Sequence, residues 1–322
     1  MIRLTLAVPC FNEEDNVGAF YDAVKRTFDG VLSYEIVFVN DGSTDKTGER
    51  LRKIYDSHTA NVTVVSFSRN FGKESAVYAA LQHSRGELVC IIDSDMQQSP
   101  DVALEMVRYL DEHADCDCCA AYQEKRIEGR TISFFKDAFY SFADKLSDVK
   151  MRHSASDFRV FRRNVAEALM DMKEYHRFSK GMFSWVGFET HYIPYTAESR
   201  LTGETKWSFS KLMKYAFSGI ISFSTKPLRI PFYLGGLFTA AGLVWLIVIA
   251  VLGVMNGLSD NYRMNIILSF IMLMSGLILV CVGILCEYIS QVFIQVKGRP
   301  IYIERSCMTY SEENEEDKGT VL

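Results

Sequence analysis

The chain has 322 residues, of which 48% are hydrophobic and 23% charged, a balance that excludes a disordered polymer and can fill a sizeable core. The formal net charge is −5, and residues 311–318 (SEENEEDK) hold five acids and one lysine, so the rest of the chain is close to neutral. We therefore expect no bulk binding to nucleic acid.

The eight cysteines show no framework spacing, and the N-terminal segment MIRLTLAVPCFNEED has neither a basic region nor a long apolar run. We therefore expect the N-terminal part of the chain to remain in a reducing cytoplasm. Cys116, Cys118 and Cys119 lie close together, but no second cysteine pair completes a set of four ligands, so we expect no metal there.

Short β-rich runs alternate with helical patterns over the first two hundred residues. The predicted strands are 2–9, 34–40, 61–67 and 87–93, and the predicted helices are 13–28, 46–57, 73–84 and 100–112. This alternation is typical of βαβ units, so we predict an α/β fold with a mostly parallel sheet covered by helices.

Polar clusters follow all four predicted strands, at residues 9–14, 40–43, 68–70 and 93–95. Open parallel sheets bind ligands at the carboxyl ends of their strands, so these clusters mark the expected site. Neither a Walker A pattern nor GxGxxG follows the first strand, so the sequence does not indicate a P-loop or dinucleotide-binding protein.

Asp93 and Asp95 form a DxD pair after the apolar run LVCII. Strand alternation places both carboxylates on one side and Ser94 on the other. Two carboxylates so placed can hold a divalent cation that neutralises a diphosphate. The alternative is a cluster that caps the helix predicted at 100–112.

Two uncharged stretches near the C-terminus, 230–255 and 264–286, are each long enough to span a bilayer as a helix. A buried hairpin of a soluble domain is the alternative, but the first stretch has no polar stripe. The flanking basic residues are Lys226, Arg229, Lys297 and Arg299. They place both flanks in the cytoplasm.

The segment before the first stretch has apolar residues at the spacing of one helical face. Between residues 200 and 229 there are six basic residues and one acid, a balance suited to anionic headgroups. We predict an interfacial helix here, with packing on the soluble domain as the alternative.

Six ordered motifs then resemble those of a known family: VPCFNEEDN, VNDGSTDKT, SRNFGKESA, DSDMQ, SDFRVFRR, and RLTGETKWSFSKL with a downstream FSTKPLRI. The chain resembles the family 2 glycosyltransferases of the GT-A fold, specifically the membrane-anchored polyisoprenyl-phosphate glycosyltransferases, which include bactoprenol glucosyltransferases and dolichol-phosphate mannose synthases. The departures from the pattern are Met96, Asn40 and Ser156, and none removes a group that the chemistry needs.

For the donor site, the resemblance implies that Pro9, Glu13 and Asp41 contact the nucleotide base and ribose. An Asx-turn is the alternative role of Asp41. The resemblance further implies that Asp93 lies near the ribose and the metal. The residues implied to ligate Mg²⁺ or Mn²⁺ are Asp95, Asp93 and Gln97. Lys73 either supports the nucleotide site or pairs with a neighbouring acid.

For the acceptor site, the resemblance implies that Asp157 positions the sugar and acceptor, with a structural role in a strand as the alternative. Two anionic phosphates need fixed positive charge, which Arg200 and Lys206 are best placed to supply. Arg126 and Arg130 are further candidates, for which a solvated helix face is equally expected.

The resulting prediction is inverting transfer of a hexose, glucose or N-acetylglucosamine, from a UDP-sugar to undecaprenyl phosphate, for cell-envelope glycosylation. GDP-mannose as donor and a non-catalytic nucleotide-sugar sensor are the alternatives. We expect a multi-pass inner-membrane protein that forms a homo-oligomer and passes its product to a separate flippase. The expected organisation is a cytoplasmic GT-A domain (1–200), an interfacial segment (201–229), spans at 230–255 and 264–289, and a cytoplasmic acidic tail (297–322).

Overall fold

The computed structural model describes residues 2–57, 61–123, 155–175, 177–195 and 260–309, together with positions 237, 240, 244 and 247. The chain divides into two compact units. The first unit comprises Met1–Asp137, Lys150–Lys211 and Pro300–Leu322, and the second comprises Ala138–Val149 and Leu212–Arg299. Each unit is described by itself.

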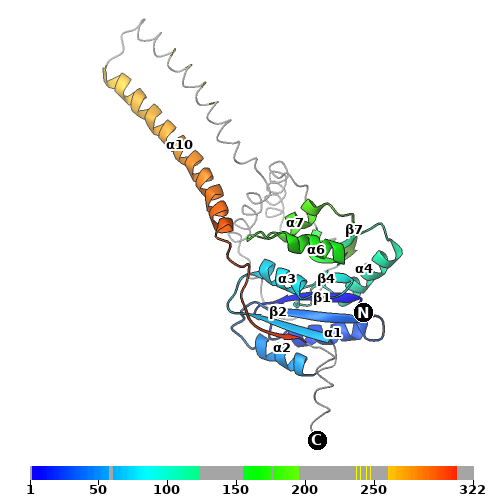
Figure 1. Cartoon of the computed structure of the whole chain (residues 1–322). Coiled ribbons are helices and arrows are strands. Elements are labelled where there is room, and N and C mark those ends of the chain that lie inside the picture. Colours follow the sequence, from blue (N-terminus) through cyan, green and yellow to red (C-terminus); the bar gives the residue numbers. More distant parts are fainter. Residues whose placement is uncertain are drawn as a thin grey trace. The chain divides into compact units, whose positions relative to one another are not determined.

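The first unit is built on an eight-stranded sheet with the order β7-β5-β6-β4-β1-β2-β3-β8 (Figure 1). The strands are β1 Leu4–Cys10, β2 Tyr34–Asn40, β3 Asn61–Phe67, β4 Leu88–Ile91, β5 Cys118–Gln123, β6 Ala155–Arg162, β7 Thr190–Tyr195 and β8 Glu304–Thr309. The four strands β3, β2, β1 and β4 are mutually parallel, whereas β6 and β8 run antiparallel to β4 and β3. The predicted α/β class with a mostly parallel sheet is confirmed.

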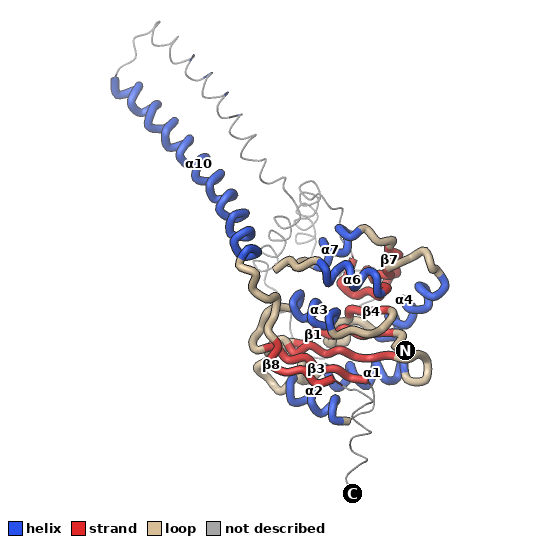
Figure 2. Tube along the Cα trace, in the orientation of Figure 1, coloured by secondary structure: helices blue, strands red, loops and turns tan. Residues whose placement is uncertain are grey.

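Helices follow the central strands, as the sequence predicts (Figure 2). They are α1 Val17–Phe28, α2 Thr47–Asp56, α3 Lys73–Gln82, α4 Pro100–Glu112, α6 Arg163–Asp171 and α7 Ser179–Val186. α1 contacts both α2 and α4, whereas α3 packs on β1 and β2 and contacts α6. The helices thereby cover both faces of the sheet, as parallel strands require.

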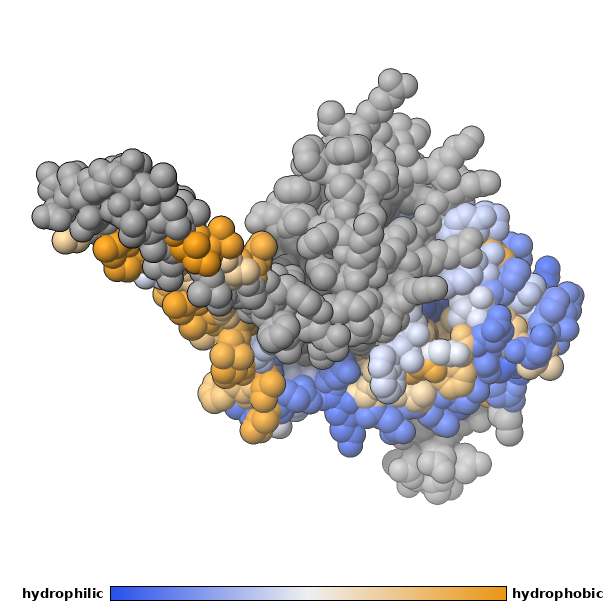
Figure 3. All heavy atoms as spheres, turned by 90° about the horizontal axis from the view of Figure 1, so that it is seen from above, coloured by the Kyte–Doolittle hydropathy of each residue, from blue (hydrophilic) through white to orange (hydrophobic). Residues whose placement is uncertain are grey.

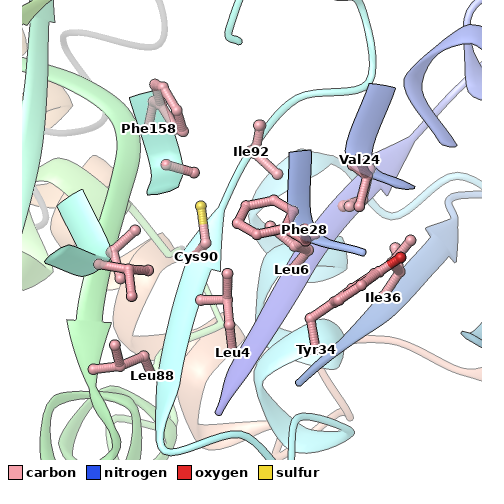
Figure 4. Packing of buried hydrophobic residues seen from close by; sticks show 14 of the residues in the cluster. Leu4, Leu6, Val24, Phe28, Tyr34, Ile36, Leu88, Cys90, Ile92 and Phe158 are labelled. Carbon is pink, nitrogen blue, oxygen red and sulfur yellow. The ribbon is translucent and has the colours of Figure 1, made fainter. Parts of the chain in front are cut away.

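The core lies between β1 and the helix that follows it. Leu4, Leu6 and Val8 of β1 are fully buried and belong to one apolar cluster with Phe20 and Phe28 of α1 (Figure 4). Because β1 and β2 are buried on both faces, their sequences are nearly continuous apolar runs. This burial fixes the positions at which the strands end, and so the edge of the sheet where the polar clusters lie.

The last strand, β8, falls within residues 297–322, which are predicted only as an acidic tail. β8 runs antiparallel to β3 along an edge of the sheet (Figure 2). Ser68 N donates to the Ile303 carbonyl at 3.0 Å, and the Tyr302 ring stacks on Phe67 with 4.7 Å between centroids. The sequence ERSCMT is largely exposed, so it lacks the apolar alternation by which a strand is recognised.

The second unit contains α10, Asp260–Val296, which includes the predicted span 264–289. Within the described part of the chain, α10 holds the one segment long and apolar enough to cross a membrane, Met274–Val296, with a mean hydropathy of 2.2. Many of its described apolar side chains are exposed, among them Ile278, Leu279 and Val296, and orange spheres mark this helix in Figure 3. The predicted segments 201–229 and 230–255 lie outside the described residues, apart from the four isolated positions in the second.

A buried carboxylate ties β1 and β2 to the loop that precedes β4. The Glu35 side chain is only 1% exposed, and it accepts hydrogen bonds from Thr5 Oγ1 at 2.6 Å, the Arg85 amide at 2.6 Å and Arg85 Nε at 2.8 Å. A buried carboxylate is tolerated only when donors surround it. Arg85 supplies both an amide and a cation, so it is the main partner.

We predict that Arg85→Ala lowers the free energy of unfolding by about 2 kcal/mol, because the buried Glu35 carboxylate loses its charged donor. Arg50→Ala, on the exposed side of α2, is the matched control and is expected to change stability by less than about 0.5 kcal/mol. Denaturant unfolding of the detergent-solubilised full chain measures both. Equal stabilities of the two variants would show that the Arg85 side chain contributes nothing.

Candidate active site

The loops that follow β1 and β2 are joined by hydrogen bonds between their side chains and backbones. Asn12 N donates to Ser43 Oγ at 3.0 Å, and its Oδ1 accepts from Thr44 N at 2.9 Å. Glu13 N donates to Thr47 Oγ1 at 2.8 Å. Asn12 has a positive φ of 54°, a conformation that asparagine tolerates better than most residues. The two strand ends thus form one surface.

Of the residues implied to contact the nucleotide, Pro9 pairs with Val39 within the parallel ladder of β1 and β2. The Glu13 carboxylate accepts from Asn16 Nδ2 at 2.6 Å, directly before α1. Both residues therefore lie at the carboxyl end of β1, as expected. Their contacts with a nucleotide stay a prediction.

Asp41 joins the end of β2 to the loop after β3. Its side chain is almost completely buried and accepts hydrogen bonds from Phe71 N at 2.6 Å and Gly72 N at 2.9 Å. Burial raises the pKa of this carboxyl, and the two amides act in the opposite direction. The local side-chain bond in this turn is made by its neighbour Asn40, whose Oδ1 accepts from Ser43 N at 3.0 Å. Asp41 therefore fixes the loop that leads into α3.

Gly42 allows the loop after β2 to lie directly against the loop after β3. Its φ is +61°, and a Cβ at this position would lie 2.3 Å from Arg69 C and 2.5 Å from Asn70 N. Both of these atoms belong to the backbone, so neither can turn aside. Only glycine satisfies the conformation and the close approach together.

Asp93 and Asp95 lie in the turn after β4. The strand ends at Ile91, so the strand alternation used to orient the pair does not apply to them. Asp93 N donates to Gln98 Oε1 at 2.9 Å, and Gln98 Nε2 donates back to Asp93 Oδ2 at 3.3 Å. Asp95 Oδ1 accepts from Gln97 N at 3.1 Å. A tight local turn, rather than a strand, sets the directions of the two carboxylates.

Helix capping does not explain the pair. The N-cap of α4 is Ser99, whose Oγ accepts from Asp101 N at 3.3 Å. Asp93 and Asp95 precede this cap by several residues, and their carboxylates are only partly buried. They are therefore available for another role.

Lys73 brings the carboxylates of two strands together. Its Nζ lies 2.6 Å and 2.7 Å from the two carboxylate oxygens of Asp93, and 3.9 Å from Asp157 Oδ2. The last pair of the antiparallel ladder is Ile91 with Arg159, so the turn after β4 begins close to the part of β6 that carries Asp157. Lys73 therefore pairs with neighbouring acids, and its support of the nucleotide site stays a prediction.

Asp157 faces several positive groups. Burial raises the pKa of its carboxyl, but Lys73, Lys180 and Arg159 outweigh it, so the pKa lies below its usual range. Its Oδ1 is buried without a hydrogen-bond partner, as is Nε of Arg159, whose guanidinium lies 3.9 Å from the centre of the Phe183 ring. Asp157 is therefore ionised at neutral pH.

Three residues that contribute to this arrangement are absent from the sequence-based site: Gln98, Lys180 and Arg159. Gln98 stands next to the DSDMQ motif, and Arg159 lies inside SDFRVFRR, so their positions carry a weak signal. Lys180 comes from α7 and has no signal of its own. The remaining candidates, Arg126, Arg130, Arg200 and Lys206, lie outside the described residues.

The residues present fit a divalent cation. Asp93, Asp95 and the Gln97 amide offer only oxygen ligands at one turn, the donor type that Mg²⁺ and Mn²⁺ take in proteins. The Asp93 carboxylate already attracts positive charge, because both of its oxygens lie within 2.7 Å of the Lys73 ammonium. A divalent cation at this turn would therefore share the Asp93 carboxylate with Lys73 or displace the ammonium from it.

We predict that Lys73→Met destabilises the protein near pH 7 and that this loss shrinks below about pH 4. The pKa of Asp157 is lowered in the folded protein, so its ion pair stabilises the fold above the unfolded pKa, near 4, and the stabilisation is lost as the pH falls through the lowered value. Thermal unfolding of the full chain at several pH values measures the difference. A difference that stays constant down to pH 3 would contradict this assignment.

We also predict that Gly42→Ala lowers both thermal stability and the affinity of the site for its ligand, since the added methyl would overlap the backbone of residues 69 and 70. The matched control is Gly18→Ala in α1, where a Cβ meets nothing within 4 Å. That change is expected to be neutral or slightly stabilising. Thermal unfolding separates the two variants, and equal midpoints would show that the loops tolerate the methyl group.

Comparison with known proteins identifies the family. Residues 5–170 match the family model described as glycosyl transferase family 2. The prophage bactoprenol glucosyl transferase homolog of Escherichia coli K12 is 35% identical, covering 94% of this chain and 98% of that protein. The bactoprenol glucosyl transferase of Shigella phage SfII is 35% identical, covering 94% of this chain and 97% of that protein. The uncharacterized glycosyltransferase YkcC of Bacillus subtilis is 32% identical, covering 97% of this chain and 96% of that protein.

Among solved structures, the fold is similar to glucosyl-3-phosphoglycerate synthase from Mycobacterium tuberculosis in complex with Mn²⁺, UDP-glucose and phosphoglyceric acid. The TM-score is 0.51 at 17% identity, over 68% of this chain and 78% of that one. This likeness confirms the GT-A-like α/β fold. The sequence resemblance is likewise confirmed: the chain belongs to glycosyl transferase family 2 and is a glycosyltransferase.

Proposed function

We propose that this glycosyltransferase transfers a hexose, glucose or N-acetylglucosamine, from a UDP-sugar to undecaprenyl phosphate at the cytoplasmic face of the membrane. The observation that carries the proposal is the carboxylate cluster of Asp93, Asp95 and Asp157 around Lys73. It lies in a chain that is 35% identical, over 94% of its length, to proteins named bactoprenol glucosyl transferase. An exposed apolar helix in the same chain supports a lipid acceptor.

In this proposal the donor lies across the carboxyl ends of β1, β2 and β4. Pro9, Glu13 and Asp41 serve the nucleotide, with Asp41 also fixing the loop that presents Lys73. Asp95, Asp93 and Gln97 would hold Mg²⁺ or Mn²⁺, which supplies electrophilic assistance to the departing diphosphate.

The acceptor phosphate attacks the anomeric carbon and inverts its configuration, and the bond to the diphosphate breaks. A lipid monophosphate has a second pKa of about 6, so it is largely dianionic at neutral pH and needs no base to remove a proton. Asp157 then acts as an electrostatic and positioning group near the reacting carbon. The lowered pKa of its carboxyl agrees with this role, because a strongly acidic group is a weak base.

Basic residues hold the acceptor near the membrane in this proposal. Arg200 and Lys206 lie in the sequence RLTGETKW, at the start of the basic region 200–229, and would bind the lipid phosphate, with Arg126 and Arg130 as further contacts. The spans 230–255 and 264–289 make the protein a multi-pass membrane protein with its catalytic domain, 1–200, in the cytoplasm. A homo-oligomer and a separate flippase that receives the product complete the proposal.

The deciding experiment presents UDP-glucose, UDP-N-acetylglucosamine and GDP-mannose separately to the purified full chain with undecaprenyl phosphate and Mg²⁺ or Mn²⁺. Lipid-linked sugar is measured by mass spectrometry. We expect one UDP-sugar to give a product. A product from GDP-mannose alone would replace the donor assignment, and donor binding without any product would favour a nucleotide-sugar sensor.

We predict that Asp95→Asn lowers turnover at least about 100-fold, because a neutral amide is a poorer partner for the cation that assists the leaving group. Asp115→Asn, an exposed acid after α4, is the matched control and is expected to keep full activity. The same lipid-product assay measures both, after thermal unfolding has shown that each variant is folded. Wild-type turnover in Asp95→Asn would refute the metal assignment.

A further inference from the structure

A second group of metal-ligating side chains lies at the end of α3 farthest from Lys73. His83 caps the C-terminus of α3, and Glu304 and Cys307 lie on β8. One ligand atom from each of the three residues lies within 4.8 Å of the others. His83 Nε2 is 2.9 Å from Glu304 Oε1, and His83 Nδ1 is 3.9 Å from Cys307 Sγ.

The distances approach those of a coordinated metal. With metal–sulfur and metal–nitrogen bonds of about 2.3 Å and 2.0 Å, tetrahedral geometry separates the two ligand atoms by roughly 3.6 Å. The observed distance between Sγ and Nδ1 is 3.9 Å, so a small rotation of the exposed Cys307 side chain brings them into place. The carboxylate oxygen is near enough to be a third ligand.

The neighbouring groups suit such a site. Glu304 lies beside Nε2 of the His83 ring, so the other ring nitrogen, Nδ1, faces the Cys307 sulfur. The Tyr302 hydroxyl donates to Gln82 Oε1 at 2.7 Å and also lies 3.1 Å from Glu304 Oε1. Such outer contacts hold metal ligands in orientation.

We propose that His83, Cys307 and Glu304 bind a zinc ion, with water as the fourth ligand. The mixture of sulfur, nitrogen and oxygen selects zinc over the hard cations that suit the oxygen-only turn at Asp93 and Asp95. On binding, the thiol proton of Cys307 is released to solvent and Glu304 turns from the histidine ring to the metal.

A metal at this site would stabilise the position of β8 at the edge of the sheet. β8 is an edge strand whose residues follow α10 in the chain, and backbone pairing with β3 is its main attachment. A metal shared by His83 and two β8 residues would tie that strand to α3 within the first unit. The inference is independent of the sugar and lipid assigned above.

The test uses the full-length protein in detergent, with a non-thiol reductant and excess Mg²⁺, and Co²⁺ as the spectroscopic probe of the zinc site. We expect one equivalent of Co²⁺ to produce thiolate-to-cobalt charge-transfer absorption, and one equivalent of Zn²⁺ to remove it. Cys307→Ser should abolish the band. His83→Gln and Glu304→Gln should each weaken Co²⁺ binding at least about tenfold.

Two controls separate this site from other metal binding. Cys286→Ser, which removes another exposed free cysteine, and Asp95→Asn, which alters the turn after β4, should both keep the band and the affinity. The proposal is overturned if wild-type protein shows no thiolate band, or if the band persists in Cys307→Ser.

Discussion

The site depends on Lys73, whose ammonium lies near two carboxylates that would otherwise repel one another. Asp93, in the turn after β4, and Asp157, on β6, both lie near Lys73, and two ionised carboxylates are costly together without positive charge. Lys73 supplies that charge from the first turn of α3. The start of α3 is itself set by Asp41, which binds the amides of the two residues before it. The acid on β2 thus positions the lysine that makes the acids of β4 and β6 compatible.

The central sheet follows directly from the sequence. The predicted strands 34–40 and 61–67 coincide with β2 and β3, because strands buried on both faces are apolar runs that end sharply at polar turn residues. The same reasoning extends the fourth strand too far. β4 ends at Ile91, and the acids that follow are oriented by the Gln98 side chain and a turn with Met96 at a φ of +61°. Strand alternation predicts the directions of side chains within a strand. Beyond the strand end, local hydrogen bonds set those directions.

Other features lie outside local sequence signals because they depend on contacts between distant segments. β8 is an exposed edge strand, so its residues need no apolar pattern, and only its pairing with β3 defines it. Lys180 influences Asp157 from α7, more than twenty residues away in the chain. The packing of helices on the sheet brings such distant residues together, and no local sequence pattern indicates it. The family motifs locate Asp157 and Lys73 but do not show that the two residues meet.

The charges around Asp157 favour a fixed anion over a proton acceptor. A catalytic base works best when its pKa lies near the operating pH, yet Lys73, Lys180 and Arg159 together hold the pKa of Asp157 below its ordinary value despite burial. The Asp157 carboxylate is therefore ionised at neutral pH. Glycosyl transfer develops positive charge at the anomeric carbon, and an oriented carboxylate that is already ionised stabilises such charge without reorganising. The proposed phosphate acceptor would need no base, because its nucleophilic oxygen is already deprotonated at neutral pH.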